Sequence, residues 1–368
     1  MDAFIKLMKK TIIIPLNRPT LTKKDENSLK KLPIFNLFSG NITEKFENEF
    51  AKYVGRKYAI AVNSGTSALH LALLALDIKE KDEVICSSYT CVALLNAISY
   101  VKAEAKLVDC NFNVEKGDFN ISLFDLKNKI SSKTKAIIVP HMFGFPAEIE
   151  KIIKLGIPVI EDATQSLGGE YLGKKLGSYG AISIFSVHFS KMITTGNGGV
   201  FATDSENLYR KAKFFGDYEN TIVQQRLKKP ESYNVQYNYK VSDLNAYLGI
   251  SQLNQLNQFV NKRKSIAKVY SRLLKGIAQL PDLSKENIFW RYVIEIEKNP
   301  IEVIKEAAKN GIEIGRGVYP PLHQYLKMDD KLFPNTKKAI SSLIALPIYP
   351  SLTDKEINYL IKVLKNIL

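Results

Sequence analysis

Residues 183–200 read SIFSVHFSKMITTGNGGV and place one lysine, Lys191, in a run of small, hydroxylated and glycine residues. Ser186 precedes this lysine by five residues, and two threonines and a Gly-x-Gly-Gly turn follow it. Such neighbours are typical of a tight, partly dehydrated pocket, where desolvation lowers the pKa of a lysine and makes its amine nucleophilic. The stretch therefore favours a Schiff-base lysine. The alternative is a solvated lysine in a Gly/Thr loop, which is the ordinary state of lysines.

The length and composition predict a large folded protein. The chain has 368 residues, 45% of them hydrophobic, which suggests two domains or one large domain with an appendage. No apolar run approaches the roughly 20 residues of a membrane helix, and the N-terminal run Ile12–Ile14 is too short for the core of a signal peptide. Cys86, Cys91 and Cys110 lack metal-ligand spacing and are odd in number. We expect a cytoplasmic protein without a metal centre or membrane association.

The chain is basic, with 52 Lys and Arg against 37 Asp and Glu, a formal net charge of +15. Such a balance fits a nucleic acid or a small anionic substrate such as a nucleotide. The basic residues are scattered among acidic neighbours, with no dense block interleaved with aromatic residues. We therefore expect a solvated surface and no nucleic-acid binding.

Short apolar runs alternate with helical segments between residues 57 and 162. This alternation predicts a mostly parallel sheet covered by helices, with ligands at the carboxyl ends of its strands. Asn63-Ser-Gly-Thr66 and Asp162 lie at such ends. The predicted strands are Tyr58–Val62, Glu83–Cys86, Ala105–Asp109, Lys135–Pro140 and Pro158–Glu161, with Ala181–Ser186 and Gly199–Thr203 on either side of the lysine loop.

Flanking segments complete the predicted organisation. Thr43 is an expected helix N-cap, and Ser242 is expected to cap a long helix that continues through Leu256 towards Leu274. Asp217–Tyr239 is predicted to be a long irregular loop with a functional or interfacial role. We divide the chain into an N-terminal segment (1–30), a large domain (31–255) and a small C-terminal domain (256–368), in which Asn287–Glu297 is a predicted strand and Thr353–Ile367 a predicted helix.

Three features of the predicted large domain together fit pyridoxal phosphate. The phosphate needs N–H and hydroxyl donors, which the helix start at Gly65, Thr66 and Ser67 supplies. The protonated pyridine nitrogen needs an anion, which Asp162 supplies, and the aldehyde needs the amine of Lys191. Taken singly, a Ser or Thr at a helix start is more often only an N-cap, and Asp162 is also explained as a cap. Their combination favours the cofactor.

Five motifs in a fixed order make the sequence resemble a known family, the DegT/StrS family of pyridoxal-phosphate sugar aminotransferases. The resemblance covers nearly the whole chain. It implies the aspartate-aminotransferase fold (fold type I), an α/β fold in which a seven-stranded, mostly parallel sheet forms a large cofactor-binding domain beside a smaller C-terminal α+β domain. The motifs are NSGTSALHLALLAL (63–76), DEVICSSYT (82–90), EDATQSLGGEYLGKKLGSYG (161–180), FSVHFSKMITTGNGGV (185–200) and YNYKVSDLNAYLGISQL (237–253).

The resemblance also implies residue roles. Lys191 looks like the lysine that binds the cofactor and shuttles the proton, and Asp162 like the partner of the pyridine nitrogen. Gln165 resembles the residue that bonds the phenolic oxygen of the cofactor. Asn238 resembles a residue that reaches the phosphate of the neighbouring subunit, which implies a homodimer with shared sites. The implied phosphate ligands are Thr66, Ser67 and Ser186.

The resemblance places further residues near the substrate. Tyr319-Pro-Pro-Leu-His323 is similar to the C-terminal segment that borders the substrate pocket in the family, and His188 is expected near Lys191. A packed or capping role is the alternative for each histidine.

Two positions depart from the family pattern. Cys91 stands where the family has an aromatic residue stacked on the cofactor ring, so that either its sulfur covers the ring or Tyr89 or another aromatic does so. Asn197 stands where the family has glutamate between glycines. Neither departure removes a catalytic group.

The implied reaction is transamination, because relatives that dehydrate sugars carry histidine at the position of Lys191. An amino donor, glutamate, would load the cofactor with an amino group. A keto sugar on a nucleoside diphosphate would accept that group and yield an amino sugar for a surface polysaccharide or glycoconjugate. Two alternatives stay open: an enzyme of the same fold acting on a non-nucleotide substrate, and a non-catalytic regulator that keeps the fold.

Overall fold

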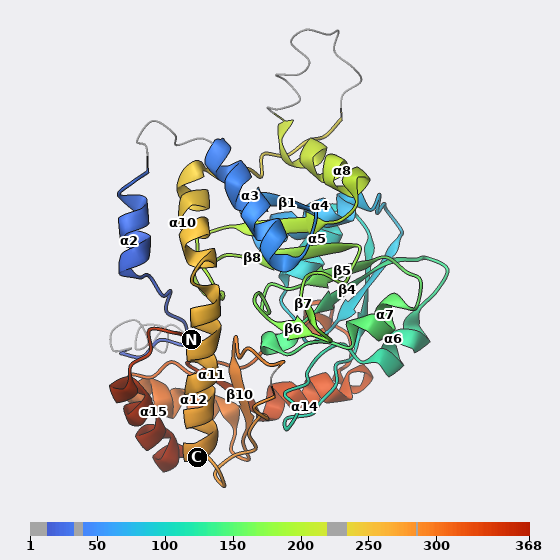
Figure 1. Ribbon diagram of the computed structural model, residues 1–368. Helices are drawn as coiled ribbons and strands as arrows, with labels where there is room; N and C mark the ends of the chain where they lie inside the picture. Colours follow the sequence, from blue (N-terminus) through green and yellow to red (C-terminus); the bar gives the residue numbers. More distant parts are fainter. Residues whose placement is uncertain (1–12, 33–39, 219–233, 285) are drawn as a thin grey trace.

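The computed structural model describes residues 13–32, 40–218, 234–284 and 286–368 (Figure 1). Their centre is a seven-stranded sheet with the order β1-β9-β8-β5-β4-β2-β3. Strand β9 runs antiparallel to both neighbours, and the other pairs are parallel, so the predicted mostly parallel α/β sheet is confirmed. The strands are β1 (Tyr58–Val62), β2 (Glu83–Ser87), β3 (Glu104–Val108), β4 (Thr134–Pro140), β5 (Val159–Asp162), β8 (Ile182–Ser186) and β9 (Gly199–Thr203).

Both faces of this sheet are buried, which explains why its strands read as continuous apolar runs rather than as alternating ones. In β1, Ile60 and Val62 pack on one face with α4 and α5, whereas Ala59 and Ala61 pack on the other face with α3 and α10. The helices of this part are α2 (Lys23–Leu29), α3 (Asn41–Val54), α4 (Gly65–Ala75), α5 (Ala93–Tyr100), α6 (Leu123–Lys129), α7 (Ile149–Ile153), α8 (Glu206–Gly216) and α10 (Asp243–Leu253), and β6 (Glu170–Tyr171) with β7 (Lys174–Lys175) forms a two-residue hairpin.

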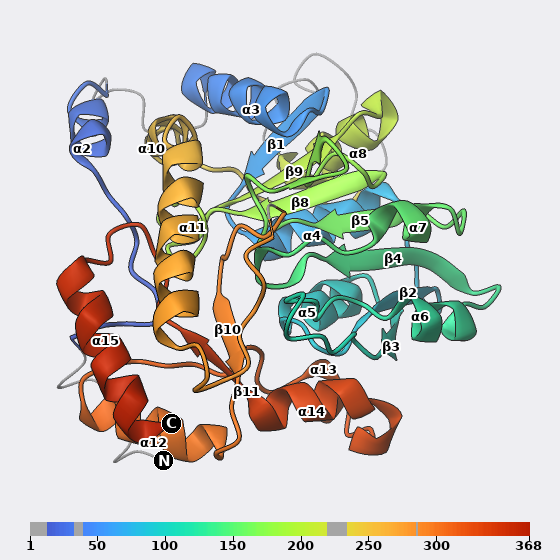
Figure 2. The same ribbon diagram turned by 60° about the horizontal axis from the view of Figure 1, so that its bottom comes forward.

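The C-terminal elements form their own core beside the large sheet. Figure 2 shows α11 (Leu256–Leu273) leading from α10 towards the small antiparallel sheet of β10 (Tyr292–Glu295) and β11 (Leu343–Leu346). The apolar faces of α11, α12 and α15 pack on this sheet. The remaining elements are α12 (Pro300–Lys309), α13 (Leu322–Tyr325), α14 (Pro334–Ser342), α15 (Asp354–Ile367) and two short 3-10 turns at Met142–Gly144 and Asp330–Leu332.

Several local predictions need correction. Thr43 is not a cap, because α3 begins after Gly40 and the buried Thr43 hydroxyl donates instead to the Asp243 carboxylate at 2.7 Å. Ser242 does cap α10, accepting a bond from the Asn245 N–H, but the expected long helix breaks at Asn254–Gln255.

Other boundaries shift or fall outside the described residues. The strand expected over residues 287–297 is shorter, from Tyr292 to Glu295, whereas the last helix agrees with its prediction. Most of the predicted loop 217–239 lies outside the described residues. The boundary predicted between residues 255 and 256 coincides with the start of α11 and stays a prediction as a domain limit.

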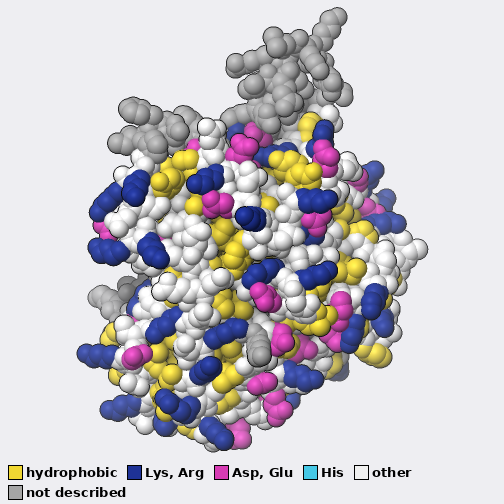
Figure 3. All heavy atoms as spheres, viewed as in Figure 1, with side chains coloured by type: hydrophobic (Ala, Val, Ile, Leu, Met, Phe, Trp, Pro, Cys, Tyr) yellow, Lys and Arg dark blue, Asp and Glu magenta, His cyan; other side chains and the backbone are white. Residues whose placement is uncertain are grey.

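The surface agrees with the scattered charge of the sequence. On the face shown in Figure 3, Lys and Arg side chains are spread among Asp and Glu rather than gathered in one block. None of the helices within the described ranges is both long and apolar enough to cross a membrane. The same ranges contain no group of three His, Cys, Asp or Glu side chains arranged to hold a metal ion.

Candidate active site

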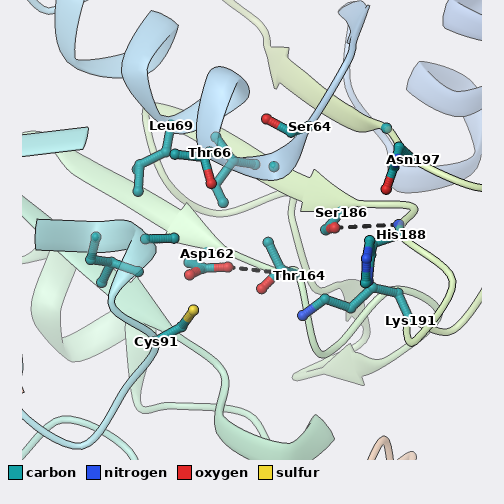
Figure 4. A pocket seen from close by; sticks show the side chains of 15 residues that line it. Ser64, Thr66, Leu69, Cys91, Asp162, Thr164, Ser186, His188, Lys191 and Asn197 are labelled. Atoms are coloured by element: carbon teal, nitrogen blue, oxygen red, sulfur yellow. Dashed lines mark hydrogen bonds between the residues drawn. The ribbon is translucent and has the colours of Figure 1, made fainter. Parts of the chain in front are cut away.

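A cavity of about 300 Å³ opens where α4 begins and where β5 and β8 end (Figure 4). The carboxyl ends of parallel strands are the usual ligand position in such sheets. The side chains that carry the expected chemistry come from three separate stretches of sequence and meet here. The cavity is lined by Ser64, Gly65, Thr66, Leu69, Cys91, Ala93, Leu94, Asp162, Thr164, Ile184, Ser186, His188, Lys191, Asn197 and Gly198.

The first wall of the cavity is the N-terminus of α4. Ser64 caps this helix by accepting a bond from the Ser67 N–H at 3.0 Å. Gly65 lies against β8, because a Cβ added there would come within 3.0 Å of Ser186 Cβ. The free N–H groups of the first turn, the helix dipole and the hydroxyls of Thr66 and Ser186 form a donor set for an anion such as phosphate.

Close backbone packing holds this anion cradle together. A Cβ on Gly199, at the start of β9, would lie 2.4 Å from the Ser64 carbonyl carbon, so only glycine fits there. Ser67, also predicted as a phosphate ligand, is buried and does not line the cavity. Its hydroxyl donates to Asn63 Oδ1 at 2.6 Å and braces the turn from behind.

The second wall carries the carboxylate of Asp162, the last residue of β5. Asp162 is 5% exposed, and its Oδ1 accepts the Thr164 N–H at 3.0 Å. Burial raises the pKa of this carboxyl, while the positive charge of Lys191 acts in the opposite direction. A cationic group placed in the cavity would therefore stabilise the ionised form of Asp162.

The third wall carries Lys191, in the loop between β8 and β9. Figure 4 shows its amine reaching into the cavity towards the side on which Asp162 and Cys91 lie. Burial lowers the pKa of this amine, and the carboxylate of Asp162 opposes that shift. Its Nζ also lies 4.6 Å from the ring centroid of Trp290, which covers it from the C-terminal part of the chain. A dehydrated amine of this kind is a better nucleophile than a solvated one.

Two other predicted residues also line the cavity. The Cys91 side chain is exposed there, whereas Tyr89 is fully buried against Phe119 and Phe143, with ring centroids 6.3 and 6.0 Å away. Of the two residues proposed to cover a cofactor ring, the cysteine is therefore at the cavity and the tyrosine is not. His188 lines the cavity with its Nδ1 3.1 Å from Ser190 Oγ, and its pKa is lowered by burial and by the charge of Lys191.

Besides Ser67, four predicted residues lie outside the cavity lining. Gln165 is buried next to Asp162, and its Oε1 accepts the Phe143 N–H at 2.8 Å. Asn238 lies on the surface, where its backbone pairs with Asp217. Tyr319 is 59% exposed, with the Arg316 guanidinium 4.0 Å from its ring centroid.

His323 also lies outside the cavity, completely buried. Its Nδ1 lies 2.6 Å from Ser88 Oγ, and its Nε2 donates to Asp330 at 2.8 Å. The ring stacks on Phe333 with a centroid separation of 4.6 Å. We define Ser88, His323 and Asp330 as the Ser88 triad, which connects the end of β2 to the C-terminal elements. The alternative packed role of this histidine is the one that these contacts favour.

Some lining residues were not predicted. Ser64 precedes the predicted residue Gly65, and Thr164 lies between the predicted residues Asp162 and Gln165. Both therefore belong to motifs that already indicate the site. Asn197 was noted only as a departure from the family, and it lines the cavity beside Gly198. Trp290 lies 99 residues from Lys191 in the sequence, and no local pattern connects the two.

These walls fit pyridoxal phosphate on the chemistry of their donors. An anion cradle, a buried carboxylate and a dehydrated amine share one cavity, as the phosphate, the pyridine nitrogen and the aldehyde require. Together with the sheet order, this site defines the class: a pyridoxal-phosphate-dependent enzyme of the aminotransferase fold.

Comparisons with known proteins identify the family. Residues 24–365 match the model of the DegT/DnrJ/EryC1/StrS aminotransferase family, and the chain belongs to this family of pyridoxal-phosphate-dependent sugar aminotransferases. Among curated relatives, it is 33% identical to the GDP-perosamine synthase of Escherichia coli O157:H7 over 94% of this chain and 96% of that protein. It is also 33% identical to the putative pyridoxal phosphate-dependent aminotransferase EpsN of Bacillus subtilis, over 88% and 87% of the two chains.

Solved structures confirm the fold. The putative sugar aminotransferase Spr1654 from Streptococcus pneumoniae, in its PMP-form, aligns with a TM-score of 0.86 at 23% identity, covering 96% of this chain and 98% of that one. A GDP-4-keto-6-deoxymannose-3-dehydratase aligns with a TM-score of 0.85 at 23% identity, covering 95% and 100%. Because an aminotransferase and a dehydratase share this fold, the residues of the site must decide the reaction.

Proposed function

We propose that this protein transfers an amino group from glutamate to the keto group of a nucleoside-diphosphate sugar in the cytoplasm. The observation that carries the proposal is the meeting of Lys191, Asp162 and the α4 N-terminus at one cavity. The 33% identity to a protein named GDP-perosamine synthase supports a nucleotide-sugar substrate. The product would be an amino sugar used in a surface polysaccharide or glycoconjugate.

The residues of this chain have separable roles in the proposed reaction. The α4 N-terminus, Thr66 and Ser186 would bind the cofactor phosphate and so orient the ring. Asp162 would supply the negative charge that keeps the ring nitrogen protonated. The bound cofactor supplies an electron sink for the carbon that loses a proton. Lys191, whose pKa is lowered by burial, would take that proton and return it, as a general base and then a general acid.

The same proposal includes a homodimer. Asn238 lies on the surface beside the α4 N-terminus, where the Asn63 N–H donates to the Tyr239 carbonyl at 2.8 Å. A residue in this position is available to a neighbouring subunit. Light scattering should give twice the monomer mass of 41.5 kDa, and Asn238→Ala should weaken cofactor binding. A monomer that keeps full cofactor affinity and activity would rule out the shared site.

The chemistry is tested by half-reactions of the purified holoenzyme. Visible absorbance should disappear on addition of glutamate and return on addition of a nucleotide-linked keto sugar. Borohydride should attach the cofactor to Lys191, as identified by peptide mass spectrometry. Lys191→Ala should abolish transfer, whereas Lys309→Ala, on the exposed surface of α12, should not. Amino-group transfer by Lys191→Ala would contradict this mechanism.

The same assay separates the alternatives. Return of absorbance with a free keto sugar, but not with its nucleotide-linked form, would favour the non-nucleotide substrate. No response to any amino donor in protein that retains the cofactor would favour the non-catalytic regulator.

A further inference from the structure

A second, smaller cavity lies on the far side of Lys191. The only residue that it shares with the cofactor cavity is Lys191 itself. Its volume is about 10 Å³, close to the space that one water-sized particle requires. It is enclosed by Arg18, Pro19, Thr20, Phe189, Lys191, Met192, Ile193, Thr194, Gln252, Arg263 and Pro350.

All the charged side chains that line this cavity are basic. Arg18, Lys191 and Arg263 line it, and no carboxylate does. Arg18 has an ion-pair partner outside the lining, since its Nη1 lies 2.9 Å from the carboxylate of Glu356. Within the described ranges, Arg263 has no ion-pair partner at all. The cavity therefore holds an uncompensated positive charge, which is costly in a protein interior.

Arg263 also has an unsatisfied donor. The residue is 4% exposed, and its Nη1 donates to backbone carbonyls, including that of Trp290 at 3.2 Å. Its Nε is inaccessible to solvent and has no hydrogen-bond partner among the described residues. Burial and the neighbouring Arg291 lower the pKa of Arg263 to about 9, which reflects the missing counter-charge. An unpaired buried N–H of a charged group is unfavourable, and an acceptor placed beside Arg263 Nε would remove that penalty.

We propose that the second cavity is a binding site for one small monovalent anion of halide size, chloride in the cell, held between Arg263 and Arg18 behind the cofactor lysine. The volume excludes a phosphate or an amino-acid carboxylate group with its attached chain. Chloride is somewhat larger than water, and the Arg18 side chain, 34% exposed, is the part of the wall that can move outward. The bound anion would place negative charge on one side of Lys191 while Asp162 does so on the other.

The chain contains a built-in probe of this site, because Trp290 is its only tryptophan. Its carbonyl accepts from Arg263, and its ring lies next to the Lys191 amine. Trp290 is only 8% exposed, so dissolved bromide should quench it little by collision. Bromide bound in the cavity would instead quench its fluorescence with a saturating dependence on concentration.

The experiment titrates the holoenzyme with bromide at constant ionic strength, with gluconate as the balancing anion. We expect saturable quenching that chloride reverses and that sulfate and acetate do not. Arg18→Gln should weaken apparent bromide affinity about tenfold or more, the factor that corresponds to about 1.4 kcal/mol. Arg210→Gln, which removes an exposed arginine from α8, is the matched control and should bind bromide normally. Circular dichroism shows whether each variant is folded.

Three outcomes would overturn the proposal. Quenching linear in bromide, or equal in wild type and folded Arg18→Gln, would mean that the cavity holds only water. Acetate or sulfate competing as well as chloride would mean a larger anion site. Crystals soaked in bromide give the direct check, because anomalous density should lie beside Arg263 Nε. An empty cavity with bromide bound elsewhere would contradict the proposal. None of these readouts depends on the identity of the sugar or the amino donor.

Discussion

The cofactor cavity and the Ser88 triad contain residues from equally prominent motifs, yet the fold uses the two groups differently. Asp162 and Lys191 come from strand ends of one sheet, and both face open space. Ser88 and His323 are 235 residues apart in sequence and meet in a fully buried contact. A chemically reactive residue type therefore indicates function only where the topology leaves room for a ligand. Predictions that exchange the same residue type in both regions test this distinction.

The largest expected effect follows from Asp162→Asn. Removing the negative charge from the buried wall should lower turnover by about 10²-fold or more, as loss of one preorganised electrostatic contact does in other enzymes. Asp330→Asn makes the same exchange in the Ser88 triad and should leave turnover unchanged. Steady-state rates of both purified variants test the prediction. Equal losses of turnover in the two variants would contradict the functional difference between the two regions.

The next effect is on stability. His323→Ala removes the ring partner of the buried Ser88 hydroxyl, which keeps only the bond from the backbone N–H of residue 323, and should lower the free energy of unfolding by about 1–3 kcal/mol. Because His323 does not line the cavity, KM for the sugar should remain unchanged. His188→Ala, at the cavity, should show the reverse pattern of raised KM with little loss of stability. Urea unfolding and steady-state kinetics measure both quantities. A raised KM with normal stability in His323→Ala would indicate that this histidine belongs to the substrate pocket.

Much of the cofactor cavity was predictable because strand ends in a parallel sheet converge. The residues from Asn63 to Ser67, Asp162 and Lys191 are local signals whose meeting follows from strand order alone. The contacts of Trp290 and His323 depend on how α11 directs the C-terminal elements against the sheet, and no periodicity encodes that angle. The break at Asn254–Gln255 was missed for the same reason, since both residues continue a helical pattern.

A smaller effect is expected on the pH dependence of stability, through a histidine of α4. His70 lies one turn after Thr66 in α4, with its Nδ1 2.9 Å from the Tyr239 hydroxyl. Burial lowers its pKa from the ordinary value of 6.5 to about 4, so the folded protein holds it neutral. The unfolded chain binds a proton below about pH 6.5 and the folded one does not, so stability should fall as pH drops from 6.5 towards 4.

The measurement is the free energy of unfolding between pH 7 and pH 4 for wild type and His70→Gln. The glutamine variant should lose less stability over this interval, because it removes the group whose protonation differs between the two states. Parallel curves would show that His70 is protonated equally in both states, against the burial that the structure gives it.

The smallest effect is expected at Cys91, where the cavity itself departs from the family pattern. Its thiol is exposed at the cavity, while Cys86 and Cys110 are fully buried, and burial raises the pKa of the Cys86 thiol to about 12. N-ethylmaleimide should therefore modify Cys91 alone, and bound cofactor should slow the reaction, as mass spectrometry of the intact protein can follow. Cys91→Ser should reduce turnover only a few-fold, since a sulfur contact is worth about 0.3–1.5 kcal/mol. Modification of Cys91 at the same rate with and without cofactor would mean that its sulfur does not cover the cofactor ring. Another residue, outside this wall of the cavity, would then have to cover it.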